Sequence, residues 1–468
     1  MHRLTSLCTE YFGNSDLTIS PITGSGSNRQ YFRISRPDGK SLIGVVGTSK
    51  EENIAFLHIS EALAAAQIPV PQIYAVSADS MCYIQQDLGS TALFDTLSPA
   101  RQNGQYSNHD IDLLKKTMTL LADIQFAGGK NIDYSRCYPQ PEFDRRMISF
   151  DLNYFKYCFL KTSALDFQEI ALDDDFNRLA DDLLAGTTDT FMYRDFQARN
   201  VMIYNDTTYF IDYQGGRRGP IYYDVASFLW QAKAAYPDAL RQALIDTYIE
   251  SARKYTDIDR AEFIDRLRLF VLFRTLQVLG AYGFRGEYER KEHFIRSVPF
   301  AIDNLRTLID TPFANYPYLQ SLLTQLTAIP RYQHKKTERL TVDVYSFSYK
   351  KGLPADTSDN GGGYIFDCRG MHNPGRYDRY KQLTGRDQEV IDFLEQRREV
   401  FTFLDAAYSL VDHHTECFIR RGFAHLLVAF GCTGGQHRSV YCAEHMAHHL
   451  RQKYDINVNL IHREMNEK

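Results

Sequence analysis

Cysteine pairs and long apolar segments are both missing from this sequence. Its eight cysteines are scattered, with no Cys-x-x-Cys pair, which argues against a disulfide framework and against a zinc ribbon. No apolar run approaches the roughly 18 residues that span a bilayer. Residues 1–5 do not begin the apolar core of a signal peptide. We therefore expect a cytoplasmic protein with no membrane partner.

An excess of one charge sign is also lacking. The formal net charge is −5 at pH 7, which gives the chain no general attraction to nucleic acid or membranes. Basic residues gather at Lys335-Lys336 and between Arg376 and Arg398. An RNA or protein partner and an ordinary solvated surface explain these residues equally well.

The chain has enough apolar material for packed domains. With 468 residues, 44% of them hydrophobic, and with 31 Tyr and 30 Phe, we expect two or three domains with aromatic-rich cores.

The most informative stretch runs from Tyr193 to Asn200 and is followed by Ile211-Asp212. It places Asp195, then Asn200, then Asp212 after a short hairpin of strands 201–204 and 208–211. Phosphoryl transfer from ATP needs a carboxylate to take the proton of the attacking hydroxyl. It also needs an amide and a second carboxylate to hold Mg²⁺. An Asp alone is usually a turn or strand-end residue, but the three groups at this spacing predict Asp195 as the base and Asn200 and Asp212 as metal ligands.

The surrounding pattern predicts a two-lobed kinase-like region. Residues from about 17 to 90 alternate strand-like segments with one helical segment at 52–66, and residues 111–326 are mostly amphipathic helix. We expect a small β lobe over about 1–90 and a helical lobe over about 91–328. Asp224 is expected to cap a helix and brace the catalytic loop.

The remainder of the chain predicts a separate domain. The polar segment 329–339 contains Pro330 and several basic residues and is typical of a linker. Beyond it, strands at 340–347, 364–367, 424–430 and 458–461 alternate with helices at 387–418 and 438–453. The expected architecture is an α+β bilobal protein-kinase-like fold over 1–328, followed by a small α/β domain over 340–468 with a largely parallel sheet.

A glycine-containing turn upstream is the candidate nucleotide loop. Gly24 and Gly26 join two strands and can close over the ATP phosphates, while Arg29 or Arg33 can meet their charge. Strand 42–46 has no Lys where a kinase would hold the α- and β-phosphates, so Arg33 is the expected substitute.

Residues 15–310 resemble the aminoglycoside phosphotransferase and choline kinase superfamily. The resemblance is closer to bacterial anomeric kinases that phosphorylate N-acetylmuramate and N-acetylglucosamine. The matching segments are 29–33, 193–200, 211–214 and 219–220 with 223–224. This resemblance implies an ATP- and Mg²⁺-dependent kinase with an amino sugar as its small-molecule partner.

A second glycine turn follows the last long apolar strand. Residues 431–440 read as a strand end, a Gly loop and a helix start, which is a natural phosphate cradle. The spacing from Cys432 to Arg438 also matches the C-x5-R loop of cysteine phosphatases, although Gly431 stands where those enzymes usually place His.

The better match for residues 339–468 is the RapZ C-terminal domain, with matches at 366–369, 373–374, 384–385 and 431–440. That family implies sensing of glucosamine-6-phosphate and, in some bacteria, RNA binding. Carried over by residue, the phosphosugar pocket is Thr433, Gly434, Gly435 and Arg438. Gly375-Arg376 stand where that family has a pocket His.

Together these observations predict an amino-sugar kinase whose C-terminal domain binds a phosphorylated amino sugar for sensing or regulation. Two alternatives stay open: a non-catalytic sensor or adaptor, and a C-x5-R phosphatase activity in the C-terminal domain.

Overall fold

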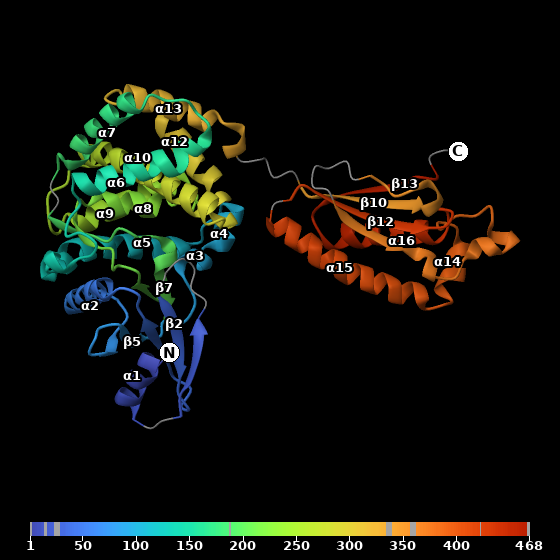
Figure 1. Cartoon of the computed structure of the whole chain (residues 1–468), viewed down its shortest axis with the longest axis horizontal. Helices are drawn as coiled ribbons and strands as arrows, with labels where there is room; N and C mark the ends of the chain where they lie inside the picture. Colours follow the sequence, from blue (N-terminus) through green and yellow to red (C-terminus); the bar gives the residue numbers. More distant parts are fainter. Residues whose placement is uncertain are drawn as a thin grey trace. The chain divides into compact units, whose positions relative to one another are not determined.

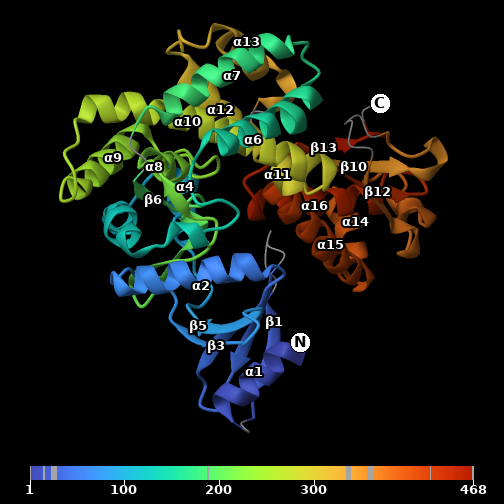
Figure 2. The same cartoon turned by 60° about the vertical axis from the view of Figure 1, so that its left-hand side comes forward.

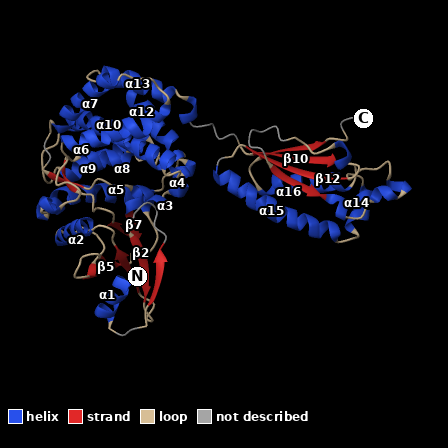
Figure 3. Cartoon of the chain, viewed as in Figure 1, coloured by secondary structure: helices blue, strands red, loops and turns tan. Residues whose placement is uncertain are grey.

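The computed structural model describes residues 2–13, 16–22, 29–186, 189–333, 339–355, 362–421 and 423–465. The chain forms two compact units, Met1–Gln333 and His334–Lys468, shown in Figure 1. The first unit has a sheet-rich small lobe and a larger helical lobe, and the second combines a sheet with helices (Figure 3).

A five-stranded antiparallel sheet of order β1-β2-β3-β5-β4 forms the small lobe. Its elements are α1 (His2–Phe12), β1 (Thr18–Ile22), β2 (Gln30–Ser35), β3 (Ser41–Val46), α2 (Lys50–Ala65), β4 (Ile73–Val76) and β5 (Cys82–Gln86). Helix α2 begins after Ser49, whose hydroxyl accepts the backbone N–H of Glu52 at 3.2 Å.

Each face of this sheet packs against one helix (Figure 2). Ile43 and Val45 pack toward α2 and belong to the main core of the first unit. The opposite face packs against α1 through Leu4 and Leu7. The sequence analysis did not expect α1, although its apolar residues recur at helical spacing.

The larger lobe is mainly helical and shares the main core with the small lobe. Its helices are α3 (Leu93–Thr96), α4 (Ser98–Asn103), α5 (Asn108–Asp123), α6 (Arg145–Phe155), α7 (Glu169–Leu184), α8 (Tyr222–Leu229), α9 (Asp238–Ala252), α10 (Arg260–Gly283), α11 (Glu292–Ile295), α12 (Val298–Ile309) and α13 (Pro317–Ala328). Two short antiparallel strand pairs position the site: β6 (Thr190–Met192) with β9 (Arg217–Gly219), and the hairpin of β7 (Val201–Tyr204) with β8 (Thr207–Phe210).

One helix corrects the expectation that no segment is long and apolar enough to cross a bilayer. Among the described residues, the helical stretch Arg260–Tyr288 passes that test by length and composition, and 61% of its most apolar window is buried inside the protein. Gly280 and Gly283 let it approach α6 and the helical turn after α6 closely, because a Cβ at either position would meet backbone atoms of residues 154–159. This is the environment of the central helix of a lobe.

In the second unit, the sheet has the order β11-β12-β10-β13, and all neighbouring strands among the described residues run parallel. Its elements are β10 (Thr341–Ser348), β11 (Gly363–Asp367), α14 (Gln388–Glu395), α15 (Glu399–Arg421), β12 (His425–Cys432), α16 (Arg438–Lys453) and β13 (Asn457–His462). Strand β12 is buried along nearly its whole length, as the middle of a covered parallel sheet requires. The expected parallel α/β fold is confirmed.

Candidate active site and candidate phosphate-binding turn

The three residues predicted for phosphoryl transfer lie together. The side-chain amide of Asn200 donates to the backbone carbonyl of Asp195 at 2.8 Å and to the carboxylate of Asp212 at 3.2 Å. The backbone N–H of Ile211 also donates to the carbonyl of Asn200 at 3.0 Å. The hairpin β7–β8 therefore returns the chain so that Asp212 faces the loop that carries Asp195.

Asp212 has the properties of a cation ligand. Its backbone has φ +70°, a conformation that non-glycine residues rarely adopt and that often marks functional positions. Burial, and then the nearby charge of Asp195, raise the pKa of its carboxyl. Gln214 donates to it at 2.9 Å, and the amide oxygen of Gln214 is buried without a partner in the described structure. Burial and a nearby carboxylate make the ionised form of Asp212 unfavourable unless a cation is bound. A site of this kind with oxygen ligands fits Mg²⁺.

Among the described residues, no group of three or more His, Cys, Asp or Glu side chains gathers as a metal cage. Magnesium in kinases is typically held by one or two carboxylates together with substrate phosphates. The donor set of Asp212 and Asn200 is consistent with that mode.

A buried carboxylate holds the catalytic loop in place. Asp224 accepts the backbone N–H groups of Tyr193 at 2.8 Å and Arg194 at 2.9 Å, and the side-chain amide of Gln125 at 3.1 Å. Burial raises the pKa of Asp224 to about 6, against the opposing effect of these hydrogen bonds. The bracing role predicted for Asp224 is thus observed, but the helix-cap role is wrong, because Ile221 precedes the first turn of α8.

A buried ion pair also fixes this loop. The guanidinium of Arg194 donates to both oxygens of Asp151 on α6, at 3.1 and 3.2 Å, and Asp151 is almost fully buried. Asp195 itself points outward, with 48% of its side chain exposed, and its nearest cation is Arg274 on α10 at 4.0 Å. The loop is rigid beneath Asp195, while the carboxylate stays accessible to an acceptor.

On the nucleotide side, the structure separates the two candidate arginines. Arg29 is buried, pairs with Glu52 of α2 at 3.3 Å, and influences the charge of Asp212. Arg33 instead pairs with Asp87, just after β5, at 2.7 Å. At the center of β3, Val45 is fully buried. Of the two candidates, Arg29 is therefore the one joined to the first turn of α2, and this position favours Arg29 over Arg33 as the cation that β3 lacks. Gly24 and Gly26 lie outside the described residues.

The glycine turn of the second unit lies at the carboxyl ends of the parallel strands, where ligands bind in such sheets. The hydroxyl of Ser348, at the end of β10, donates to the carbonyl of Thr433 at 2.8 Å. Gly434 has open space where a Cβ would stand. Gly435 has φ +68°, and a Cβ there would come within 2.5 Å of the Glu464 carboxylate. Thr433 and Gly434 therefore offer the more open part of the turn.

Arg438 opens α16 and is nearly fully buried. One of its terminal nitrogens donates to the carbonyls of Met371 at 2.7 Å and Arg369 at 3.1 Å. Its Nε is buried without a hydrogen-bond partner among the described residues. Arg438 thus connects the turn to the segment after β11, and its Nε is left without a hydrogen-bond partner in the part of the chain that the structure describes. All four predicted residues, Thr433, Gly434, Gly435 and Arg438, lie on one turn.

Cys432 lies at the base of the same turn. Its sulfur accepts the backbone N–H of Gly435 at 3.2 Å and lies 3.1 Å from the hydroxyl of Ser439. A thiolate would be stabilised by both donors.

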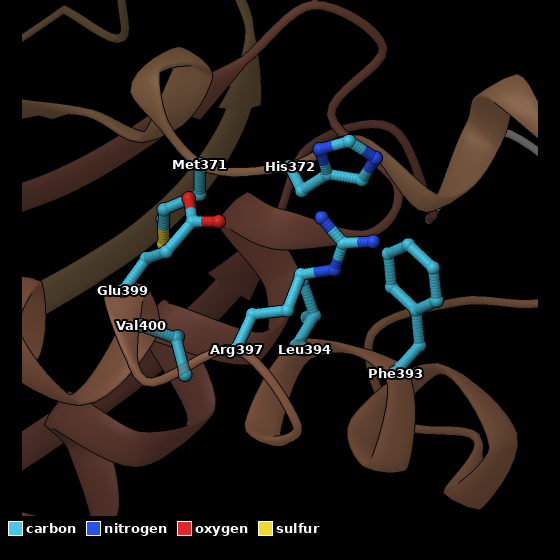
Figure 4. Close-up of a pocket in the computed structure, with 7 residues that line it drawn as sticks. All are labelled: Met371, His372, Phe393, Leu394, Arg397, Glu399 and Val400. Carbon is cyan, nitrogen blue, oxygen red and sulfur yellow. The ribbon is translucent and has the colours of Figure 1, made fainter.

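A small cavity lies beside this region, between the segment after β11 and the junction of α14 with α15 (Figure 4). Its volume is about 10 Å³, room for about one water molecule. The lining residues are Met371, His372, Phe393, Leu394, Arg397, Glu399 and Val400. This cavity cannot hold a sugar phosphate.

Sequence reasoning missed several residues that shape the first site. Glu52 was detectable in principle, because an acidic residue in the helix after β3 is where a kinase cation needs its partner. Asp151 and Arg274 gave no sequence signal, because each comes from a distant helix and meets the loop only through the packing of α6 and α10.

A model of the phosphotransferase enzyme family matches residues 18–264, more than half of the chain. The chain belongs to this family. A model of the RapZ C-terminal domain matches residues 340–466. The protein is thus a member of the phosphotransferase enzyme family with a kinase-like fold, followed by a RapZ C-terminal domain.

Solved structures similar to this phosphotransferase family member include choline kinases. One from Cryptosporidium parvum is 12% identical, covers 68% of this chain and 98% of its own, and has a TM-score of 0.47. Another from Streptococcus pneumoniae is 12% identical, covers 66% and 100%, and has a TM-score of 0.45.

Curated relatives are named nucleotide-binding proteins. One from Thioalkalivibrio sulfidiphilus is 34% identical over 157 residues, 34% of this chain and 51% of that protein. One from Bacillus licheniformis is 38% identical over 128 residues, 27% of this chain and 41% of that protein. The chain spans about half the length of these relatives or less. The narrower resemblance to anomeric amino-sugar kinases stays a prediction.

Proposed function

We propose that this phosphotransferase transfers the γ-phosphoryl group of ATP to a hydroxyl of an amino sugar of the N-acetylmuramate or N-acetylglucosamine type, in the cytoplasm. The observation that carries the kinase part is the convergence of Asp195, Asn200 and Asp212 on one loop and hairpin. The amino-sugar part rests on two resemblances that point the same way: one to anomeric sugar kinases, the other to a domain that senses an amino-sugar phosphate.

In this mechanism the exposed carboxylate of Asp195 accepts the proton of the acceptor hydroxyl as that oxygen attacks phosphorus. Arg29, fixed by Glu52, balances charge on the nucleotide phosphates. Magnesium, held by Asp212 and Asn200, would neutralise the charge that builds up on those phosphates. Asp224 and the Arg194–Asp151 pair keep the loop in one position, so that Asp195 needs little reorganisation during the reaction.

The proposal is tested by measuring ADP release against a panel of amino sugars and by identifying the phosphorylated position with ³¹P NMR. Sugar-dependent turnover that requires Mg²⁺ is the expected result. ATP binding without turnover on any acceptor would instead support the alternative of a non-catalytic sensor or adaptor.

For the second unit, we propose binding of a phosphorylated amino sugar at Thr433, Gly434, Gly435 and Arg438, with an effect on the kinase or on an RNA or protein partner. The open backbone at Gly434 and the unused Nε of Arg438 support an anion at this turn. Adding glucosamine-6-phosphate should change the kinase rate, and Arg438→Ala should abolish that effect. An unchanged rate with demonstrable binding would rule out coupling while leaving the binding site in place.

A second candidate activity for this unit is a cysteine phosphatase, favoured by the two donors that face the Cys432 sulfur. The engagement of Arg438 with two carbonyls weighs against it, because such enzymes need that guanidinium on the phosphate. Cys432→Ser should eliminate phosphosugar hydrolysis if the thiolate is the nucleophile. It should leave ligand binding largely intact in either case.

A further inference from the structure

A carboxylate lies against the glycine turn of the second unit without a partner. Glu464 follows the edge strand β13, and both of its side-chain oxygens are buried with no hydrogen-bond partner among the described residues. Burying a carboxylate in this way is costly unless a cation or hydrogen-bond donors join it. The missing contacts of Glu464 therefore indicate a positively charged group that comes from outside the chain.

The chain around Glu464 is held in place, so the carboxylate is not a loose surface group. The backbone N–H of Arg463 donates to the carbonyl of Ser346 on β10 at 3.1 Å. The guanidinium of Arg463 donates to the carbonyls of Gly352 at 3.0 Å and Lys351 at 3.3 Å. The cation next to Glu464 in the sequence is thus engaged with backbone carbonyls instead of with the carboxylate.

Gly435 brings the turn against this carboxylate. A Cβ at Gly435 would come within 2.5 Å of a Glu464 oxygen and within 2.9 Å of the backbone nitrogen of Ser348. Glycine is required here, because a Cβ would displace the carboxylate and would strain the backbone at φ +68°. The Glu464 carboxylate is therefore in direct contact with the turn, beside the end of β10.

The guanidinium of Arg438 and the carboxylate of Glu464 flank the turn from opposite sides. The turn follows β12, which lies between β11 and β10 in the sheet. Arg438 reaches the segment after β11, whereas Glu464 follows β13 and meets the turn at the end of β10. Neighbouring strands lie about 4.8 Å apart, so one sugar with its substituents is long enough to reach both groups.

We infer that Glu464 is a specificity-determining residue of this turn: it binds the ammonium group of a ligand whose phosphate is held by Arg438 and the turn backbone. The inference rests on the proposed binding of a phosphorylated amino sugar. It deepens that proposal by assigning the amine to one residue and by requiring a free amine. An N-acetyl group would remove the positive charge and place a bulkier substituent against the carboxylate.

A metal ion fits Glu464 less well than an ammonium group does. A divalent cation takes several oxygen ligands. Among the residues that the structure describes, no three His, Cys, Asp or Glu side chains gather into such a site. One carboxylate with two open oxygens is instead sufficient for an ammonium group, which donates up to three hydrogen bonds.

The test measures the binding of three hexose 6-phosphates to the whole chain by isothermal titration calorimetry. Glucosamine 6-phosphate carries an ammonium, glucose 6-phosphate a hydroxyl and N-acetylglucosamine 6-phosphate a neutral amide at the same position. Glucosamine 6-phosphate should bind at least about tenfold more tightly than the other two, the usual effect of one hydrogen bond to a charged group. Binding that survives in Arg438→Ala belongs to another site and is subtracted.

Glu464→Gln keeps the shape of the side chain and removes its charge. The Kd for glucosamine 6-phosphate should rise about tenfold, while the Kd for glucose 6-phosphate should change by less than about twofold. Glu464→Asp should retain part of the preference for the amine. Glu389→Gln, at an exposed position on α14, is the matched control and should change neither constant.

Two results would overturn the inference. The first is equal affinity for the three hexose phosphates in the unmodified protein. The second is an equal change for all three in Glu464→Gln. An equal gain would mean that the carboxylate only repels the phosphate, and an equal loss would mean that it only supports the turn.

Failure of the proposed function gives a different result. If no hexose phosphate binds in a way that Arg438→Ala removes, the proposed phosphosugar site is wrong. The role of Glu464 is then tested with ethanolamine phosphate and glycerol phosphate, which carry an ammonium or hydroxyl groups beside the phosphate. A preference for ethanolamine phosphate that Glu464→Gln removes would support the inference, and its absence would refute it.

Discussion

The catalytic loop of the first unit and the glycine turn of the second offer a phosphate group different chemistry. Around the loop, burial and then the charge of Asp195 raise the pKa of Asp212, an arrangement that repels phosphate unless a cation intervenes. The turn presents an open backbone at Gly434 and the guanidinium of Arg438. The first set suits metal-assisted transfer and the second suits binding.

The two regions are also held by buried ions of opposite sign. Asp224 accepts the N–H groups of the catalytic loop, whereas Arg438 donates to carbonyls of the segment after β11. The first brace leaves Asp195 as the outward group. The second brace, Arg438, leaves backbone N–H groups and part of its own guanidinium as the groups available to a ligand. A brace that is separate from the reactive group is what a catalytic site needs, because the reactive group can then change charge without loosening the loop.

The largest predicted effect is that of Asp195→Asn, which removes the proton acceptor and keeps the shape of the side chain. We expect kcat to fall by about 10²–10⁴, the usual contribution of a positioned general base. ADP release under saturating ATP and sugar measures it. Asp206→Asn makes the same change in the exposed turn of the same hairpin and should retain near-normal activity. A kcat within tenfold of the unmodified enzyme would show that Asp195 is not the base.

Removing the brace should be nearly as damaging and should act by another route. Asp224→Ala leaves the N–H groups of Tyr193 and Arg194 buried without an acceptor. Each such group costs about 1–3 kcal/mol, so the free energy of unfolding should fall by about 2–6 kcal/mol. Urea unfolding measures this loss, with the exposed Asp174→Ala on α7 as the control. Unchanged stability would mean that the loop does not depend on Asp224.

The two arginines of the small lobe offer a smaller effect that separates their roles. Arg29→Met should raise KM for ATP about tenfold, because it removes the cation beside Asp212, a loss of about 1.4 kcal/mol. Arg33→Met, at the Asp87 end of the strands, should change it less. Steady-state kinetics with varied ATP measures both. A larger effect at Arg33 would restore the original expectation that this residue replaces the missing lysine.

The local features of this architecture could be predicted from the sequence. Most strands and helices of both units, apart from α1, and the parallel sheet follow from periodicity. The grouping of Asp195, Asn200 and Asp212 follows from residue spacing around one hairpin. Spacing alone could not separate Arg29 from Arg33, because they are four residues apart and only the packing of α2 shows that Arg29 meets Glu52. Which of them binds nucleotide stays a prediction. Asp151 and Arg274 could not be predicted for the same reason, since their contacts with the loop come from helices far apart in the chain.

The smallest predicted effect is the pH dependence of stability that comes from Asp224, the buried carboxyl of the first unit. Asp224 has a folded-state pKa of about 6, above the roughly 3.9 of an unfolded Asp. The folded state therefore binds this proton more tightly. The stability that it contributes is full below about pH 4 and is lost as the pH rises through about 6. Between pH 7 and pH 5, this carboxyl should add about 1 kcal/mol to the free energy of unfolding. Urea unfolding of the unmodified protein and of Asp224→Asn at both pH values isolates that increment, because other carboxyls contribute equally to the two proteins. An increment of zero or of opposite sign would mean that hydrogen bonds from the loop outweigh burial, and that the brace is fully ionised throughout this range.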